Sequence, residues 1–210
     1  MKLRDHLLSR IRSHLQGQNL QFDLKTPSSC GSDPSSSEPQ TELNFVLFKD
    51  NRIYSHKLAR IYYTTYDMRR SEDVINPRTS HCDIMLLAPM ESDVATSGSF
   101  HPFLYARVLG IFHTNVIYNG PGMISYEAMR LDFLWVRWFD MSHTSNLSLD
   151  RLVFSPMASE DAFGFVDPGL VLRGCHLLPA FSVGKHHLDG IGLSRNARDA
   201  QEWKAYFVNR

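Results

Sequence analysis

From Leu43 onward, the chain is a succession of short apolar runs rich in aromatic and β-branched residues, separated by turn-forming residues. Runs of this length and composition are typical of strands. In chain order they are "LNFVLF", "RIYSHKLARIYYTTYD", "HCDIMLLAP", "PFLYARVLGIFHTNVIYN", "RLDFLWVRWFDM", "LDRLVFSP", "GLVLRGCHLLPAF" and "EWKAYFVNR". About seven short strands with turns between them predict a mainly β fold, either a small barrel or a curled antiparallel sheet.

The turn residues predict how some of these runs connect. "KDN" at 49–51 has the composition of a turn and predicts a hairpin between the first two runs. The run at 102–119 predicts a strand pair or one bent strand, with Gly110 at a bulge or tight bend. "NGPG" at 119–122 predicts another turn.

The first 42 residues have a different composition. Leu3, Leu7, Leu8, Ile11 and Leu15 recur at helical spacing, so residues 1–25 are expected to hold an amphipathic helix over 2–15 with Gly17 as its stop, followed by a lead-in. Residues 26–42, "TPSSCGSDPSSSEPQTE", predict a Ser/Pro-rich linker. The β-rich domain is therefore expected over 43–210.

Charge and cysteine content exclude several classes of protein. Lys and Arg number 22, as do Asp and Glu, so the formal net charge is zero. This balance argues against binding nucleic acid by bulk charge and leaves room for a local basic patch. The three distant cysteines form no CxxC pair, which indicates a reducing compartment and no zinc ribbon. The sequence has no signal-peptide pattern and no apolar run of about 20 residues, so we expect a soluble intracellular protein without membrane contact.

The run "LDFLWVRWFDM" is apolar on both faces of a predicted strand. Such a strand is central and covered on both sides, or covered on one side and lined with aromatic residues on the other. Arg137 on this strand needs a carboxylate partner, because an unpaired buried guanidinium is very costly. We expect that partner to be Asp167.

Basic and aromatic residues alternate between 49 and 70, a combination that suits phosphate contacts and base stacking. The candidate DNA-contacting residues are Lys57, Arg60, Arg69 and Arg70. The alternative is a solvated hairpin face whose tyrosines pack inward.

Catalysis has little support in the sequence. Asp83 and Asp132 lie at strand starts, as the acids of a metal-dependent nuclease would, but a third acid is not evident. Glu202 in "EWK" is expected on the surface. A metal site from His81, Cys82, Cys175 and His176 is disfavoured, because adjacent strand residues point to opposite faces. We therefore predict no catalytic residue, no metal and no cofactor.

Three segments in order, "FLYARVLGIF", "FLWVRWFD" and "GLVLRGCHLL", resemble the strand pattern of bromo-adjacent homology (BAH) domains. The matching positions are Ala106, Arg107, Ile111, Phe112, Val136, Arg137, Trp138, Phe139, Gly174 and Cys175. The acidic segment that usually follows "RWF" is missing here. This resemblance implies a partly open SH3/BAH-like barrel. If it reads a histone tail, the candidate aromatic contacts are Tyr105, Trp135 and Trp138, although strand alternation places the two tryptophans on opposite faces.

Nearly the whole chain, including "TTYDMRR", "INPRT" and "FVDPGLVLRGCHLLPAF", is similar to the C-terminal region of fungal Plavaka-type (Kyakuja–Dileera–Zisupton group) DNA transposon proteins. In that family the catalytic transposase region lies upstream of this part. The resemblance implies a nuclear, non-catalytic recognition module that contacts DNA, chromatin, another transposon protein or a second copy of itself. The alternatives are a metal-dependent nuclease or transposase fragment and a non-functional remnant.

Overall fold

The computed structural model describes residues 2–22, 42–89, 101–123, 125–142 and 150–209. The chain forms two compact units. The first comprises Met1–Tyr54 and His113–Asp132, and the second comprises Ser55–Phe112 and Phe133–Arg210. No helix among the described residues is both long enough and apolar enough to cross a bilayer.

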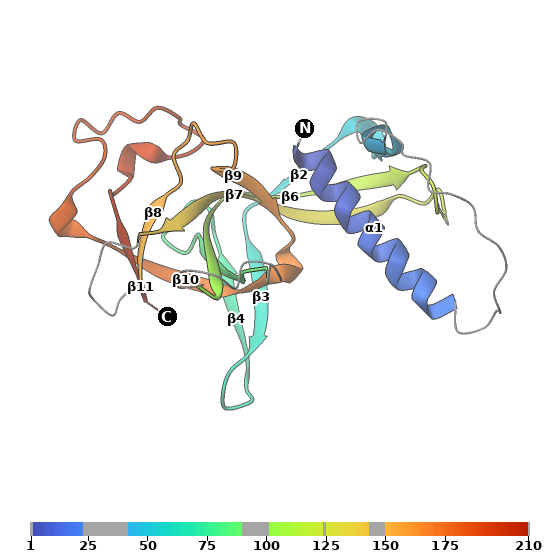
Figure 1. The fold of residues 1–210 in the computed structure, drawn as a ribbon, viewed down its shortest axis with the longest axis horizontal. Helices are drawn as coiled ribbons and strands as arrows, with labels where there is room; N and C mark the ends of the chain where they lie inside the picture. The colour runs from blue at the N-terminus through green and yellow to red at the C-terminus, as the bar shows by residue number, and fades with distance from the viewer. Residues whose placement is uncertain (1, 23–41, 90–100, 124, 143–149, 210) are drawn as a thin grey trace, which may run out of the picture. The chain divides into compact units, whose positions relative to one another are not determined.

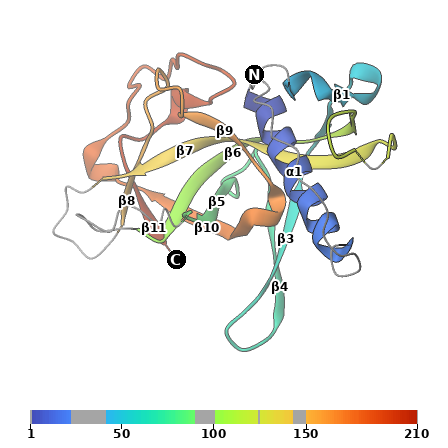
Figure 2. The ribbon, with the colours of Figure 1, turned by 45° about the vertical axis from the view of Figure 1, so that its right-hand side comes forward.

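Figures 1 and 2 show one long helix and many strands. The α-helix and 3₁₀ helices are α1 (Lys2–Phe22), η1 (Leu43–Phe45), η2 (Lys49–Asn51), η3 (Pro168–Leu170), η4 (Phe181–Val183) and η5 (Asp199–Gln201). The strands are β1 (Val46–Phe48), β2 (Tyr54–His56), β3 (Ala59–Thr64), β4 (Arg70–Ile75), β5 (Asp83–Leu87), β6 (Phe103–Tyr118), β7 (Met129–Met141), β8 (Arg151–Phe154), β9 (Phe163–Val166), β10 (Val171–Pro179) and β11 (Tyr206–Asn209). The mainly β fold with an N-terminal helix is confirmed.

In the first unit, α1 buries the apolar side chains of Leu7, Leu8 and Ile11, as the helical spacing predicted. The expected stop at Gly17 is wrong, since the helix continues to Phe22. A glycine costs only about 1 kcal/mol in a helix interior, so it does not oblige a helix to end.

The hairpin expected across "KDN" is also wrong. These residues form η2, in which Asp50 and Asn51 adopt positive φ angles of 57° and 49°. β1 pairs with the distal half of β6 instead, with Val46 opposite Tyr118.

In the second unit, hydrogen-bonded strands follow the order β6-β5-β10-β11-β8-β7-β9. Neighbouring strands such as β5 and β6, and β5 and β10, are antiparallel, with Asp83 opposite Arg107 and also opposite Cys175. β6 is one continuous strand through Gly110, which decides between the two alternatives for that run.

Two clusters of buried side chains form the core of the second unit. One gathers residues such as Ile84, Val108 and Val136, and the other gathers Tyr105, Phe139 and Tyr206. β7 is buried at successive odd and even positions, for example Phe133 and Leu134. It is therefore a central strand covered on both faces, the first of the two predicted possibilities.

β3 and β4 form a separate two-stranded sheet, the β3–β4 hairpin, which projects as an arm in Figures 1 and 2. At its base the Asp73 carboxylate accepts a 2.8 Å hydrogen bond from the Gly174 N–H of β10. Any Cβ at Gly174 would lie 3.2 Å from the Ile75 Cδ1 atom, so glycine permits this close approach. The base of the arm is thereby fixed to the sheet.

The predicted linker at 26–42 lies outside the described residues except for Glu42. The predicted domain boundaries therefore remain a prediction.

Candidate nucleic-acid interface

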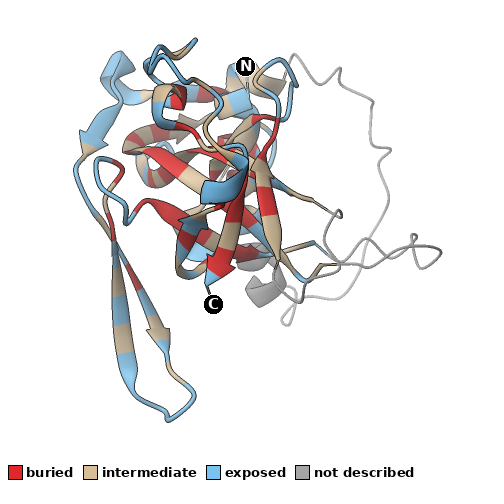
Figure 3. Ribbon diagram, turned by 90° about the vertical axis from the view of Figure 1, so that its left-hand side faces the viewer, coloured by how far each residue is buried: buried red, intermediate tan, exposed pale blue. Residues whose placement is uncertain are grey.

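The outer face of the β3–β4 hairpin carries two of the predicted DNA-contacting residues. Residues opposite one another on paired strands share a face. The pairs Arg60–Val74, Tyr62–Glu72 and Thr64–Arg70 form the outer face, and Ile61–Asp73 and Tyr63–Ser71 form the face toward β10. All six outer-face residues are exposed, as the burial colours of Figure 3 show along the arm.

All four predicted basic residues are exposed, and three belong to the hairpin. Arg60 pairs with Glu72 at 2.8 Å, and Arg69 pairs with Asp67 at 2.9 Å. Arg70 has no ion pair within the described part of the chain, and neither does Lys57, just before β3. Exposed pairs contribute little to stability, so Arg60 and Arg69 can exchange their partners for phosphate at low cost.

The tyrosines divide between the two faces. Tyr63 faces inward, where its hydroxyl donates to Asp73 at 3.2 Å and its ring lies 5.5 Å from the Arg173 guanidinium. Tyr62 is 72% exposed and Tyr66 is fully exposed. The alternative of inward-packing tyrosines therefore holds for Tyr63 and fails for Tyr62 and Tyr66.

The structure does not gather the three candidate aromatic contacts. Tyr105 is 1% exposed within one core cluster, and Trp138 packs against the other. Trp135 is half-buried and stacks on Phe163, with 6.1 Å between the ring centroids. Tyr105 is a core residue, and a role for Trp135 or Trp138 in recognition stays a prediction.

Arg137 is paired with Glu202, so the expected partner Asp167 is wrong. The guanidinium donates to both Glu202 oxygens, at 2.7 and 3.3 Å, and both side chains are buried. Asp167 instead caps η3 by accepting from the Gly169 N–H. The surface position expected for Glu202 is also wrong, because η5 and β11 bring this residue beneath the sheet.

Asp83, one of the two acids considered for metal-dependent chemistry, has both oxygens bound by the Arg107 guanidinium at 2.7 and 2.9 Å. That guanidinium also lies 5.0–5.6 Å from the ring centroids of Phe139, Phe154 and Tyr206. Asp132, in the other unit, pairs with the exposed Arg130 at 2.8 Å.

A pocket of about 370 Å³ in the second unit is lined by His81, Cys175 and His176, among others. Burial, with a contribution from the Asp83 carboxylate, raises the pKa of the neighbouring Cys82 thiol to about 12. Burial likewise raises the pKa of Cys175. Burial therefore favours the protonated form of both thiols.

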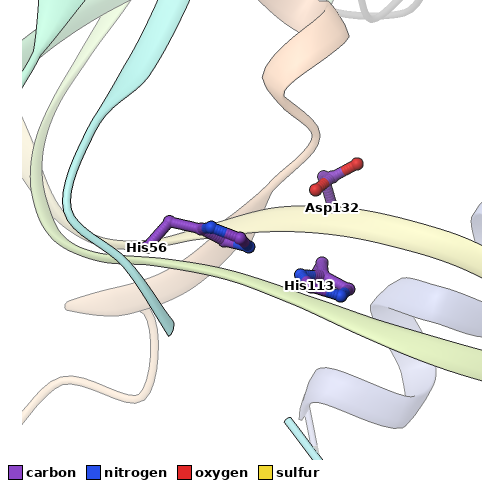
Figure 4. A group of neighbouring side chains, drawn as sticks. All are labelled: His56, His113 and Asp132. Carbon is purple, nitrogen blue, oxygen red and sulfur yellow. The ribbon is translucent and has the colours of Figure 1, made fainter. Parts of the chain in front are cut away.

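Figure 4 shows His113 on β6 and Asp132 on β7, both in the first unit, with His56 on β2, which belongs to the second. Within the first unit, ligand atoms of His113 and Asp132 lie within 4.8 Å of one another. The His113 ring also stacks on Tyr54 at 4.7 Å. Two ligands are fewer than a protein zinc site uses, so this pair supports no metal site by itself.

Sequence reasoning missed the tip of the hairpin, where Met68 is 83% exposed beside Tyr66. The signal available was "TTYDMRR", whose composition does not distinguish a turn from a strand end. No family model, curated protein or solved structure matches the chain.

Proposed function

We propose that this chain is a non-catalytic recognition module that contacts double-stranded DNA through the β3–β4 hairpin. The observation that carries the proposal is the outer face of that hairpin, where Arg60, Tyr62 and Arg70 are exposed together. The major groove admits a two-stranded β-ribbon. Strands of six residues extend about 20 Å, which is longer than the groove is wide.

The formal charge of zero means that such binding is local. Guanidinium groups on one ribbon can neutralise phosphates without a basic surface elsewhere, since each contact releases condensed counterions. From the resemblance of the sequence to transposon proteins we also propose a nuclear location and a transposon-derived origin.

The proposed scaffold is a partly open SH3/BAH-like barrel. The order of hydrogen-bonded strands supports it. The strands pair in the order β6-β5-β10-β11-β8-β7, and β7 also pairs with β6, the first strand of this series. A closed or nearly closed sheet would give the arm a rigid base.

The test is a gel-shift titration of the full chain on a duplex at roughly 50 mM and roughly 150 mM salt. We expect binding that weakens steeply with salt. Arg69→Glu/Arg70→Glu is expected to weaken binding at least tenfold and to flatten the salt dependence by about one unit of slope for each lost phosphate contact. The matched control is Arg195→Glu/Lys204→Glu, which reverses the charge of two exposed basic residues in the second unit outside the hairpin and should bind like the wild type. Absence of wild-type binding at low salt, or equal loss in the control, would overturn the proposal.

A non-catalytic role is supported by the engagement of Asp83 with Arg107. Supercoiled plasmid incubated with the protein and Mg²⁺ or Mn²⁺ is expected to remain uncut. Nicking that disappears in Asp132→Asn would establish the nuclease alternative instead.

A further inference from the structure

We propose that the hairpin tip is a wedge, in which Tyr66 and Met68 insert between base pairs of the bound DNA and kink it. This inference deepens the proposed function and depends on it. The two side chains lie two positions apart in the turn, and Tyr66 is fully exposed and Met68 83% exposed. Both side chains lie in the turn between β3 and β4, where they can contact another molecule.

Hydrogen bonds made by Thr65 fix the backbone of the tip. The Thr65 N–H donates to the Arg69 carbonyl at 2.8 Å, and the Met68 N–H donates to the Thr65 carbonyl at 2.9 Å. The Thr65 hydroxyl accepts from the Arg69 N–H at 3.2 Å and donates to Asp67. Thr65 thus makes hydrogen bonds with three residues of the turn, Asp67, Met68 and Arg69.

Met68 has a left-handed backbone, with φ at 63°. This conformation is uncommon for residues other than glycine, asparagine and aspartate. Strained residues persist only where the surrounding contacts determine them, and they gather at functional positions. A glycine would be the unstrained choice at this position, so the presence of a long apolar side chain points to a use for that side chain.

The charges around the tip select DNA as the occupant. Arg69 lies at the tip in an exposed ion pair with Asp67, and Arg70 begins β4 on the outer face. Guanidinium groups beside an apolar apex match phosphates beside a base step. Apolar wedges, methionine included, partly unstack such steps and bend the duplex. Pyrimidine–purine steps such as TA unstack most easily, so we expect the wedge to prefer them.

The experiment uses the full chain and a duplex with 2-aminopurine beside a central TA step and a fluorescence pair at its ends. Binding of the wild type is expected to increase 2-aminopurine fluorescence at least twofold and to raise energy transfer between the ends. Tyr66→Ala/Met68→Gly should lose both signals and still shift the duplex with less than tenfold weaker affinity. Glycine at 68 accepts the positive φ, so the Thr65 network is kept.

Tyr62→Ala is the matched control, because Tyr62 is an exposed aromatic residue of the same arm, away from the tip. It should retain both fluorescence signals, and equal thermal melting of all variants establishes that they are folded. A wild-type gel shift without unstacking would overturn the wedge alone. Retention of the signals in Tyr66→Ala/Met68→Gly would overturn it too. No gel shift at low salt would overturn the proposed function and the wedge together.

Discussion

At the scale of single residues, the second unit has one buried and one partly buried ion pair whose arginines lie over the same aromatic ring. The guanidinium carbons of Arg107 and Arg137 lie 5.0 and 4.2 Å from the centroid of the Phe154 ring. Their carboxylate partners, Asp83 and Glu202, are both less than 10% exposed. A buried charge is strongly destabilising when its partner is removed, whereas an apolar replacement of the whole pair is often neutral.

Glu202→Ala is therefore expected to lower the free energy of unfolding by about 3–5 kcal/mol, because it leaves the Arg137 guanidinium buried and unpaired. Urea denaturation measures this loss. The double variant Arg137→Met/Glu202→Leu should recover most of it. Arg130→Ala, at an exposed ion pair, should leave the midpoint unchanged. Equal effects of Glu202→Ala and Arg130→Ala would contradict the buried pairing.

The stability of the protein at low pH depends in part on Asp199, whose carboxylate accepts hydrogen bonds from the backbone at residues 193–194. Burial alone would raise its pKa, but the Ser194 and Leu193 N–H groups, at 3.0 and 2.6 Å, and nearby His187 outweigh it and lower the pKa. A lowered folded-state pKa gives stability that is present above the ordinary value of 3.8 and lost as pH falls below it.

We therefore expect Asp199→Asn to be less stable than the wild type at neutral pH and to lose less stability between about pH 5 and about pH 2. Denaturation at several pH values checks this. Asp189→Asn, at an exposed carboxylate that accepts only from the Ile191 N–H, should keep the wild-type profile. A wild-type profile in Asp199→Asn would refute the assignment.

The sequence was sufficient to predict that Arg137 pairs with a carboxylate, but it was not sufficient to identify that carboxylate as Glu202. An arginine within an apolar strand requires a carboxylate, and this follows from local sequence. Glu202 is 65 positions away, and only the packing of η5 and β11 brings it near. Its neighbours "EWK" read as a polar surface segment, because local composition does not reveal burial by a distant strand.

At the scale of elements, the apolar runs were sufficient to predict β5, β7, β8, β10 and β11, since each run is bounded by turn residues. They were not sufficient for pairing. "KDN" has turn composition but does not join two strands that pair with each other, whereas "TTYDMRR" lacks a clear turn signal and does. Pairing depends on which distant strand offers a matching edge, as β6 does for β1.

The contact between β7 and β9 depends on a glycine. A Cβ at Gly164 would lie 2.6 Å from the Trp138 Nε1 atom. Gly164→Ala is therefore expected to destabilise the protein by about 1–3 kcal/mol through overpacking and to change tryptophan fluorescence. In a Trp138→Phe background the same substitution should cost much less, because the clashing atom is gone. An unchanged cost in that background would show that the indole is not the obstacle.

At the scale of the whole molecule, we expect backbone amides to be protected from hydrogen exchange where their strands are buried. Amides of β5, β7 and β10, whose strands are paired on both sides, are expected to exchange slowest. Amides at the hairpin tip should exchange fastest among the described strands and turns, since few apolar contacts cover them. Hydrogen–deuterium exchange by mass spectrometry measures both. Slow exchange at the tip of the free protein would mean that the arm is covered in solution.

The β3–β4 hairpin also has a consequence for solubility. Its two strands pair only with each other among the described residues, so their outer edges offer unmatched N–H and C=O groups to any extended chain. Natural sheets discourage such edge-to-edge association with charged side chains. Arg60, Glu72 and Arg70 are charged side chains of this kind on the two strands of the hairpin. The same charges that suit a phosphate backbone would thus keep neighbouring copies from assembling into fibrils, and variants that neutralise them rather than reverse them should aggregate first.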